Sequence, residues 1–193
     1  MNRRKALGVL SACGPGLGWS AARATTDAQA LIRQGGVVVV FRHADAPGTF
    51  DPPGFRLDDC STQRNLGPQG RQQATDIGRW FARRGLKPQV VRSSPWCRCQ
   101  DTARLAFGQA EVWAALGSTV GVSPEDTASR ATQWRQALQS ASRRRPGFEV
   151  WVTHQFVMSA LAGPSAASGE GWVVAPGPDG AARILATLPA DLR

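Results

Sequence analysis

Three apolar segments of this chain each run into an arginine or a histidine, directly or within one helical turn. The segments and the side chains that follow them are residues 37–41 with Arg42 and His43, residues 89–94 with Arg98, and residues 148–153 with His154. In an open parallel sheet, ligands bind at the carboxyl ends of the strands. We therefore expect these two arginines and two histidines, which are the chain's only histidines, to meet in one place.

The rest of the pattern predicts an α/β fold. Apolar residues recur at helical spacing in three segments, and two short strands flank a turn rich in Pro and Gly near the C-terminus. The helices are expected over residues 27–34 and 67–84 and from Ser123 to before Pro146, and the hairpin strands over 171–175 and 183–188. Alternating strands and helices predict a single three-layer α/β/α sandwich, with a mostly parallel central sheet and a C-terminal hairpin.

The segment after the first strand is expected to be a loop. Residues 46–54 hold three prolines and two glycines, which excludes a helix or a central strand. A long loop directly after a strand end usually shapes or covers a site.

The N-terminus has the pattern of an export signal. A basic stretch precedes an uncharged segment, and Ala22-Arg23-Ala24 is a typical cleavage sequence. We therefore expect a signal peptide over residues 1–24, a folded domain over 25–193, and a periplasmic or secreted protein. The Arg3-Arg4 pair suggests the twin-arginine route; lipidation at Cys13, the only expected source of membrane association, ranks second.

The formal net charge is +9, and removal of residues 1–24 would leave +5, a modest positive charge that suits an anionic substrate. Nucleic acid is not an expected partner, because no basic run is interleaved with aromatic residues. The one basic cluster, Arg143-Arg144-Arg145, is interpreted as a solvated helix end.

After cleavage, three cysteines remain in an oxidising compartment. We predict a disulfide from Cys60 to Cys97 or to Cys99, which would fix the loop beside Arg98. The alternative is three free thiols. A zinc site is not expected, because the ligand spacing does not fit.

Four motifs, in chain order, resemble the histidine phosphatase superfamily, which has the phosphoglycerate mutase-like fold. They are Arg42-His43 after the first strand, the Arg64-Asn65-Leu66 to Ala74 segment, the Ser93-Ser94-Pro95 to Ala103 segment, and Val152-Thr153-His154. The resemblance covers roughly residues 37–163, and its close spacing implies the small branch of the family, without an inserted cap domain.

This resemblance implies a site that needs neither a metal nor a cofactor. His43 would be the nucleophile and would form a phosphohistidine, so its imidazole must be neutral, with the other ring nitrogen held by an acceptor such as a backbone carbonyl. Arg42, Arg98 and His154 would bind the phosphoryl oxygens. Arg92 is a weaker candidate. Arg64 could reach the rim of the site, but a surface salt bridge is the favoured interpretation.

The chain departs from the family pattern at the proton donor. Ser118 stands where relatives carry a glutamate in a Leu-x-Glu context, and Ala44 and Gln155 replace glycines. We favour Asp45 as the substitute acid, with Glu111 and Asp51 behind it.

The predicted function is that of an exported phosphomonoesterase acting on a phosphorylated small molecule through a phosphohistidine intermediate. Two alternatives stay open: a protein phosphohistidine phosphatase, and a non-catalytic phospho-ligand-binding protein on the same fold.

Overall fold

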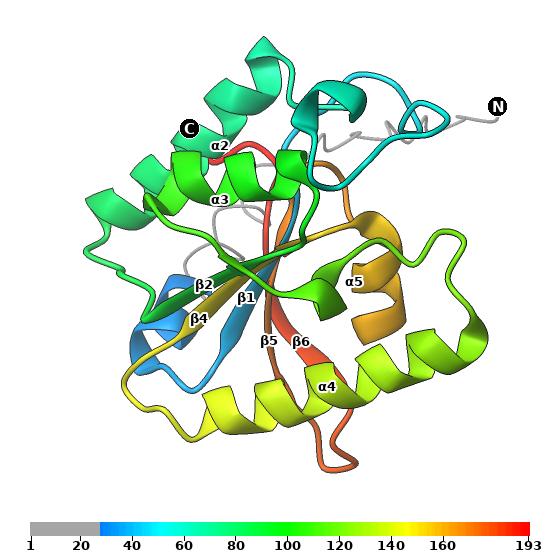
Figure 1. Cartoon of the computed structure of the whole chain (residues 1–193). Helices are drawn as coiled ribbons and strands as arrows, with labels where there is room; N and C mark the ends of the chain where they lie inside the picture. The colour runs from blue at the N-terminus through cyan, green and yellow to red at the C-terminus, as the bar shows by residue number, and fades with distance from the viewer. Residues whose placement is uncertain (1–27) are drawn as a thin grey trace, which may run out of the picture.

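The computed structural model describes residues 28–193, in which helices alternate with strands of one sheet (Figure 1). The predicted signal peptide and Cys13 lie outside the described residues. The strands are β1 (Val38–Arg42), β2 (Val90–Ser93), β3 (Glu111–Val112), β4 (Glu149–Thr153), β5 (Gly171–Pro176) and β6 (Ala182–Leu188). The helices are residues 28–34, α2 (Pro68–Arg83), α3 (Cys97–Phe107), α4 (Pro124–Ser142) and α5 (Gln155–Ala162), with short 3₁₀ turns at η1 (Cys60–Thr62) and η2 (Ala114–Leu116).

The six strands lie in the order β3-β2-β4-β1-β5-β6. Strand β1 pairs in parallel with β4, and β4 in parallel with β2. The last two strands form an antiparallel hairpin whose first strand, β5, pairs with β1. Helices α2 and α3 cover one face of the sheet, and α4 and α5 cover the other (Figure 1). The predicted α/β/α sandwich with a mostly parallel sheet and a C-terminal hairpin is confirmed.

Strand β1 is apolar throughout because both of its faces are covered. Val39 and Phe41 pack with residues of α2 and α3, whereas Val38 and Val40 pack with residues of α4 and α5. Successive side chains of a strand point to opposite faces, so one continuous valine run supplies both halves of the core. Arg42 and His43 follow Phe41 directly, so the end of the strand fixes where they stand.

The helices begin and end near the predicted positions. Ser123 caps α4, since its hydroxyl accepts a hydrogen bond from the Asp126 amide at 3.1 Å. Trp134, Leu138 and Ala141 of this helix are buried, as the periodicity predicts. After α2, Gly85 takes a φ of 63°, a left-handed conformation that favours glycine.

The basic cluster after α4 differs from the expectation at Arg144. Its guanidinium is not simply solvated, because Nη1 binds Oε1 of the buried Glu149 at 2.9 Å. Arg92, the weaker phosphate-binding candidate, binds Oε2 of the same carboxylate at 3.0 Å. A carboxylate buried in β4 needs such partners, so both arginines have structural contacts here.

A disulfide joins the long loop to the start of α3. Cys60 pairs with Cys97, and Cys99 is a buried free thiol. The predicted bond from Cys60 is therefore confirmed, with Cys97 as the partner. Because Cys97 is adjacent to Arg98, the bond ties the loop to the segment that carries a site arginine.

Within residues 28–193, none of the helices combines the length and the apolar character that a membrane crossing needs.

We predict that removing this disulfide lowers the free energy of unfolding by about 2–4 kcal/mol, because the bond closes a 37-residue separation and restricts the unfolded chain. Urea denaturation of the oxidised protein and of a Cys60→Ser/Cys97→Ser double variant measures the difference. Reductant should destabilise the wild type but leave the double variant unchanged. An unchanged wild-type midpoint under reducing conditions would contradict the prediction.

Candidate active site

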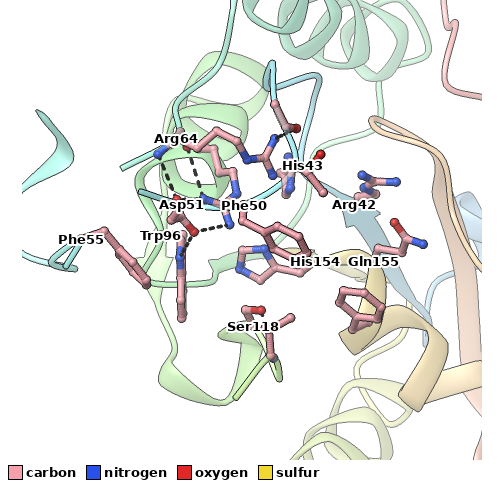
Figure 2. A pocket seen from close by; sticks show the side chains of 15 residues that line it. Arg42, His43, Phe50, Asp51, Phe55, Arg64, Trp96, Ser118, His154 and Gln155 are labelled. Atoms are coloured by element: carbon pink, nitrogen blue, oxygen red, sulfur yellow. Dashed lines mark hydrogen bonds and ion pairs between the residues drawn. The ribbon is translucent and has the colours of Figure 1, made fainter. Parts of the chain in front are cut away.

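One cavity of about 480 Å³ opens at the carboxyl ends of β1, β4 and β2 (Figure 2). Its lining comprises Arg42, His43, Gly48, Thr49, Phe50, Asp51, Phe55, Arg64, Trp96, Arg98, Ser118, Val120, His154, Gln155 and Phe156. Arg42 ends β1, His43 follows it, His154 lies between β4 and α5, and Arg98 lies in the first turn of α3. The four residues that the strand-end argument brought together therefore share one cavity.

His43 is buried, with its ring orientation fixed by the backbone. Nδ1 lies 2.8 Å from the carbonyl oxygen of Ala44, so it carries the proton and donates it there. This tautomer leaves the lone pair on Nε2, the arrangement that a histidine nucleophile needs. A backbone carbonyl as acceptor for the other ring nitrogen of His43 was expected from the sequence.

Thr102 positions that carbonyl. Its hydroxyl accepts a hydrogen bond from the Ala44 amide at 3.1 Å and donates to the Arg98 carbonyl at 2.7 Å. Ala44 is thus held between α3 and the His43 ring. Thr102 belongs to the Ser-Ser-Pro motif segment, but sequence reasoning gave it no role.

The His43 imidazole is kept neutral. Burial, with the nearby charges of Arg98, Arg64 and Arg42, lowers its pKa to about 3, and the bond to Ala44 offsets only part of this effect. The ring is therefore unprotonated at neutral pH.

His154 faces His43, with the ring centroids 5.5 Å apart. Its Nε2 is 2.7 Å from the Ser94 hydroxyl, and the Cys99 thiol lies 4.0 Å from its Nδ1. Burial and then the neighbouring His43 and Arg98 hold the pKa of His154 well below its usual value. Ser94, which follows β2, is a positioning residue that sequence reasoning missed.

Three arginines surround the two rings, and each has an unpaired N–H. Among the described residues, four buried side-chain polar atoms lack a hydrogen-bond partner, and three of them are the Nε atoms of Arg42, Arg64 and Arg98. Buried donors are nearly always paired in folded proteins. Their common location in one cavity indicates a binding site for an anion.

The favoured interpretation of Arg64 as a surface salt bridge was wrong, whereas the alternative, that it reaches the site, agrees with the structure. Arg64 lines the cavity, half-buried, and its Nη1 donates to the carbonyls of Ala46 and Gly48 rather than to a carboxylate. The 46–54 loop folds back over the site and supplies these acceptors, which brings the guanidinium inward. Arg64 follows an irregular loop and not a strand, so the strand-end pattern could not place it in the site.

Asp51 is the acidic residue of the cavity lining, and it is fully engaged. Its two oxygens accept from Arg98 Nη1 and Nη2 at 2.7 and 3.1 Å, and also from the Arg64 amide and Trp96 Nε1 (Figure 2). Burial alone would raise the pKa of Asp51, but these bonds outweigh it and lower the pKa. Asp51 is therefore an ionised carboxylate that orients Arg98 and Trp96, and it has no proton to donate at neutral pH.

The other candidate acids do not line the cavity. Asp45 is half-buried, and its amide donates to Gln73 of α2 at 2.9 Å. Glu111 lies exposed on the edge strand β3. Ser118, at the position of the family glutamate, does line the cavity. The acid role of Asp45 stays a prediction, without a direct contact to the site.

Two residues of the α2 motif hold the backbone just after His43. A Cβ atom at Gly70 would collide with the Asp45 carbonyl, so only glycine permits this approach. Gln73 accepts from the Asp45 amide and donates to the carbonyls of Ser168 and Ala190. The motif thus fastens the strand end to the helix and to the C-terminal segment.

Among residues 28–193, no cluster of three or more His, Cys, Asp or Glu side chains could hold a metal ion.

The Cys99 thiol lies 3.6 Å from His154 Nε2, and burial raises the pKa of this thiol to about 12.

We predict that neither histidine titrates between pH 5 and 8. Their pKa values lie below the unfolded value of about 6.5, so the unfolded chain binds protons first and the free energy of unfolding falls as the pH drops below about 6.5. NMR of the imidazole Hε1 signals checks this, with His43→Gln to assign the two resonances. A signal with a midpoint near pH 6.5 would show that its ring is not held as described.

Comparison with known proteins agrees with the motifs. The model of the histidine phosphatase superfamily (branch 1) matches residues 38–116, a range that holds Arg42, His43 and Arg98 but ends before His154. No curated protein sequence matches the chain.

Solved structures share the fold at low identity. The alpha-ribazole phosphatase from Shigella flexneri is 14% identical, with a TM-score of 0.56, over 81% of this chain and 98% of that one. The protein histidine phosphatase SixA, solved with tungstate, is 15% identical, with a TM-score of 0.53, over 80% and 97%. A phosphoserine phosphatase from Entamoeba histolytica, in complex with 3-phosphoglyceric acid, is 12% identical, with a TM-score of 0.55, over 78% and 95%. The resemblance is thereby confirmed: residues 38–116 match the histidine phosphatase superfamily (branch 1), and the chain shares the phosphoglycerate mutase-like fold of these phosphatases.

Proposed function

We propose that this protein is a phosphomonoesterase that hydrolyses a small phosphate ester through a phosphohistidine on His43. The observation that carries the proposal is the convergence of Arg42, Arg64 and Arg98 in one cavity with His43, a neutral imidazole whose Nδ1 is fixed. Guanidinium groups bind phosphoryl oxygens through charge-assisted hydrogen bonds and stabilise charge that shifts during transfer.

The charge of the cavity supports a phosphate dianion as the ligand. The lining holds Arg42, Arg64 and Arg98 against the single carboxylate of Asp51, with both histidines neutral. The resulting two positive charges balance a dianion. The bidentate pairing of Arg98 with Asp51 fixes the orientation of this guanidinium at the cavity wall.

The reaction then has two steps. His43 Nε2 attacks phosphorus, the bond to the ester oxygen breaks, and the leaving oxygen takes the electron pair. His154 and the arginines hold the three equatorial oxygens. Water then attacks the phosphohistidine, which releases phosphate and restores the imidazole, and the proton lost by water balances the one that the leaving group takes up.

A second candidate is hydrolysis of phosphohistidine in proteins. The lining carboxylate, Asp51, is ionised and saturated with hydrogen bonds, so no lining carboxyl group is placed to protonate a poor leaving group. An imidazole is a better leaving group than an alkoxide. A protein substrate needs an open approach, however, and an exported enzyme would not meet cytosolic phosphotransfer proteins.

We predict that His43→Ala abolishes turnover while inorganic phosphate still binds, since the arginines remain. Acid quenching is unsuitable, so wild type is quenched in alkali during turnover. Mass spectrometry should then find an alkali-stable, acid-labile phosphoryl group on His43. Arg98→Ala and His154→Ala should each lower kcat/KM by about 10²- to 10⁴-fold.

Arg143→Ala is the matched control, because Arg143 is an exposed arginine at the end of α4 and does not line the cavity. Its kcat/KM should stay within about twofold of wild type. Wild-type turnover by the His43→Ala variant would disprove the mechanism. Binding of phosphate without turnover of any phosphorylated substrate in wild type would favour the non-catalytic alternative.

We also propose that the protein is exported. The support is the charge and apolar pattern of residues 1–24, together with a disulfide between Cys60 and Cys97, a bond that persists in oxidising compartments.

Export predicts a mature N-terminus at Thr25, after the Ala22-Arg23-Ala24 sequence. Mass spectrometry of the protein from periplasmic and cytosolic fractions of a Gram-negative host measures this. An Arg3→Lys/Arg4→Lys variant tests the twin-arginine route. Intact Met1 in the cytosolic fraction alone would refute export, and a lipid-modified N-terminus at Cys13 would establish the lipoprotein alternative.

A further inference from the structure

The mouth of the cavity is unusually apolar. Among the exposed large apolar side chains of the described residues, Phe50, Val120 and Phe156 all line it, with exposed fractions of 70%, 57% and 51%. They come from three separate segments: the long loop, the turn before α4 and the start of α5. Exposed apolar groups gathered at one opening mark a ligand-binding surface.

Two further aromatic rings extend this surface inward. Trp96 stands between Phe55, at a centroid distance of 5.9 Å, and His154, at 5.1 Å. Its indole N–H is held by Asp51 at 3.0 Å, so the ring has a fixed orientation (Figure 2). Trp96 and Phe55 thus add fixed aromatic surface to the apolar side chains of the cavity lining.

Beside the arginines and histidines, the polar side chains of the lining that could recognise a hydroxylated ligand are those of Thr49, Asp51, Ser118 and Gln155. The Asp51 carboxylate is saturated, and Gln155 Nε2 donates to Ser165 at 2.7 Å. Ser118 Oγ accepts from the Val120 amide at 3.3 Å. A sugar-like leaving group would lose hydrogen bonds to water and gain few in return.

The same lining offers no carboxylic acid to the leaving oxygen, since Asp51 is ionised and Asp45 does not line the cavity. An alkoxide expelled here would have to leave unprotonated, which is slow. A phenolate leaves readily without a proton, because its conjugate acid has a pKa near that of tyrosine, about 10.

We propose that the substrates are aryl phosphate monoesters, with the phosphoryl group on the arginines and the aromatic ring held by Phe50, Trp96 and Phe156. The inference rests on the proposed function and names its substrate class. In the first step the phosphorus–oxygen bond to the ring breaks, the phenolate leaves with the electron pair, and it takes its proton from solvent.

The test compares kcat/KM for 2-naphthyl phosphate and O-phosphoserine in the full mature protein. Wild type should prefer the naphthyl ester by at least about 100-fold. The Phe50→Ala/Phe156→Ala double variant should lose about 10- to 100-fold on the naphthyl ester and less than about twofold on phosphoserine. Leu105→Ala, an exposed apolar residue of α3 outside the cavity, is the matched control and should change neither value.

A series of substituted phenyl phosphates gives an independent measurement. The rate of the chemical step should rise steeply as the pKa of the phenol falls, because no protonated carboxyl group of the cavity lining compensates the developing charge. The inhibition constant of inorganic phosphate should be unchanged in the double variant, which verifies that the folded site is intact. A peptide carrying phosphotyrosine distinguishes small phenolic esters from protein substrates: a higher kcat/KM for the peptide would overturn the small-molecule assignment.

Equal rates on aryl and alkyl esters, or equal losses on both substrates in the double variant, would overturn this inference while leaving the phosphohistidine mechanism standing. Failure to trap a phosphohistidine would instead remove the proposed function itself.

Discussion

The site depends on keeping two imidazoles neutral among three guanidinium groups. Burial and the positive charges of Arg42, Arg64 and Arg98 both oppose protonation of His43, and His154 lies in the same field. Cations placed together would ordinarily repel one another, and one carboxylate, Asp51, offsets only part of that repulsion. The arrangement is stable because the backbone and the disulfide impose it, and it leaves a surplus of positive charge that a doubly charged anion neutralises.

Most of the residues that hold the two histidines in place do not themselves line the cavity. Thr102 holds Ala44, whose carbonyl fixes the His43 ring, and Gly70 lets the next peptide lie against α2. Ser94 takes one nitrogen of His154. Thr102, Gly70 and Ser94 each belong to one of the sequence motifs. The motifs therefore include residues that position the site as well as residues that could act on a ligand.

Much of the fold, and the centre of the site, could be predicted because they follow from regular geometry. Parallel strands end at one edge of the sheet, so Arg42, His43 and His154 had to be neighbours, and helical periodicity located α2 and α4. The loop over residues 44–66 could not be predicted in the same way. Its conformation is set by contacts distant in sequence, such as Asp51 with Arg98 and Arg64 with the carbonyl of Gly48. That is why Arg64 was expected at the surface, and why Asp51, the least favoured acid, was not recognised as the partner of Arg98.

The burial of Cys99 protects the Cys60–Cys97 disulfide from thiol–disulfide exchange. Disulfide exchange requires a thiolate, and with a pKa of about 12 only about one Cys99 in 10⁵ is ionised at pH 7. The two cysteines that flank Arg98 on α3 also point to different surroundings: Cys97 meets the loop, and Cys99 is enclosed beside His154. An odd third thiol, which in an oxidising compartment could scramble the pairing, is thus made chemically inert once the chain has folded.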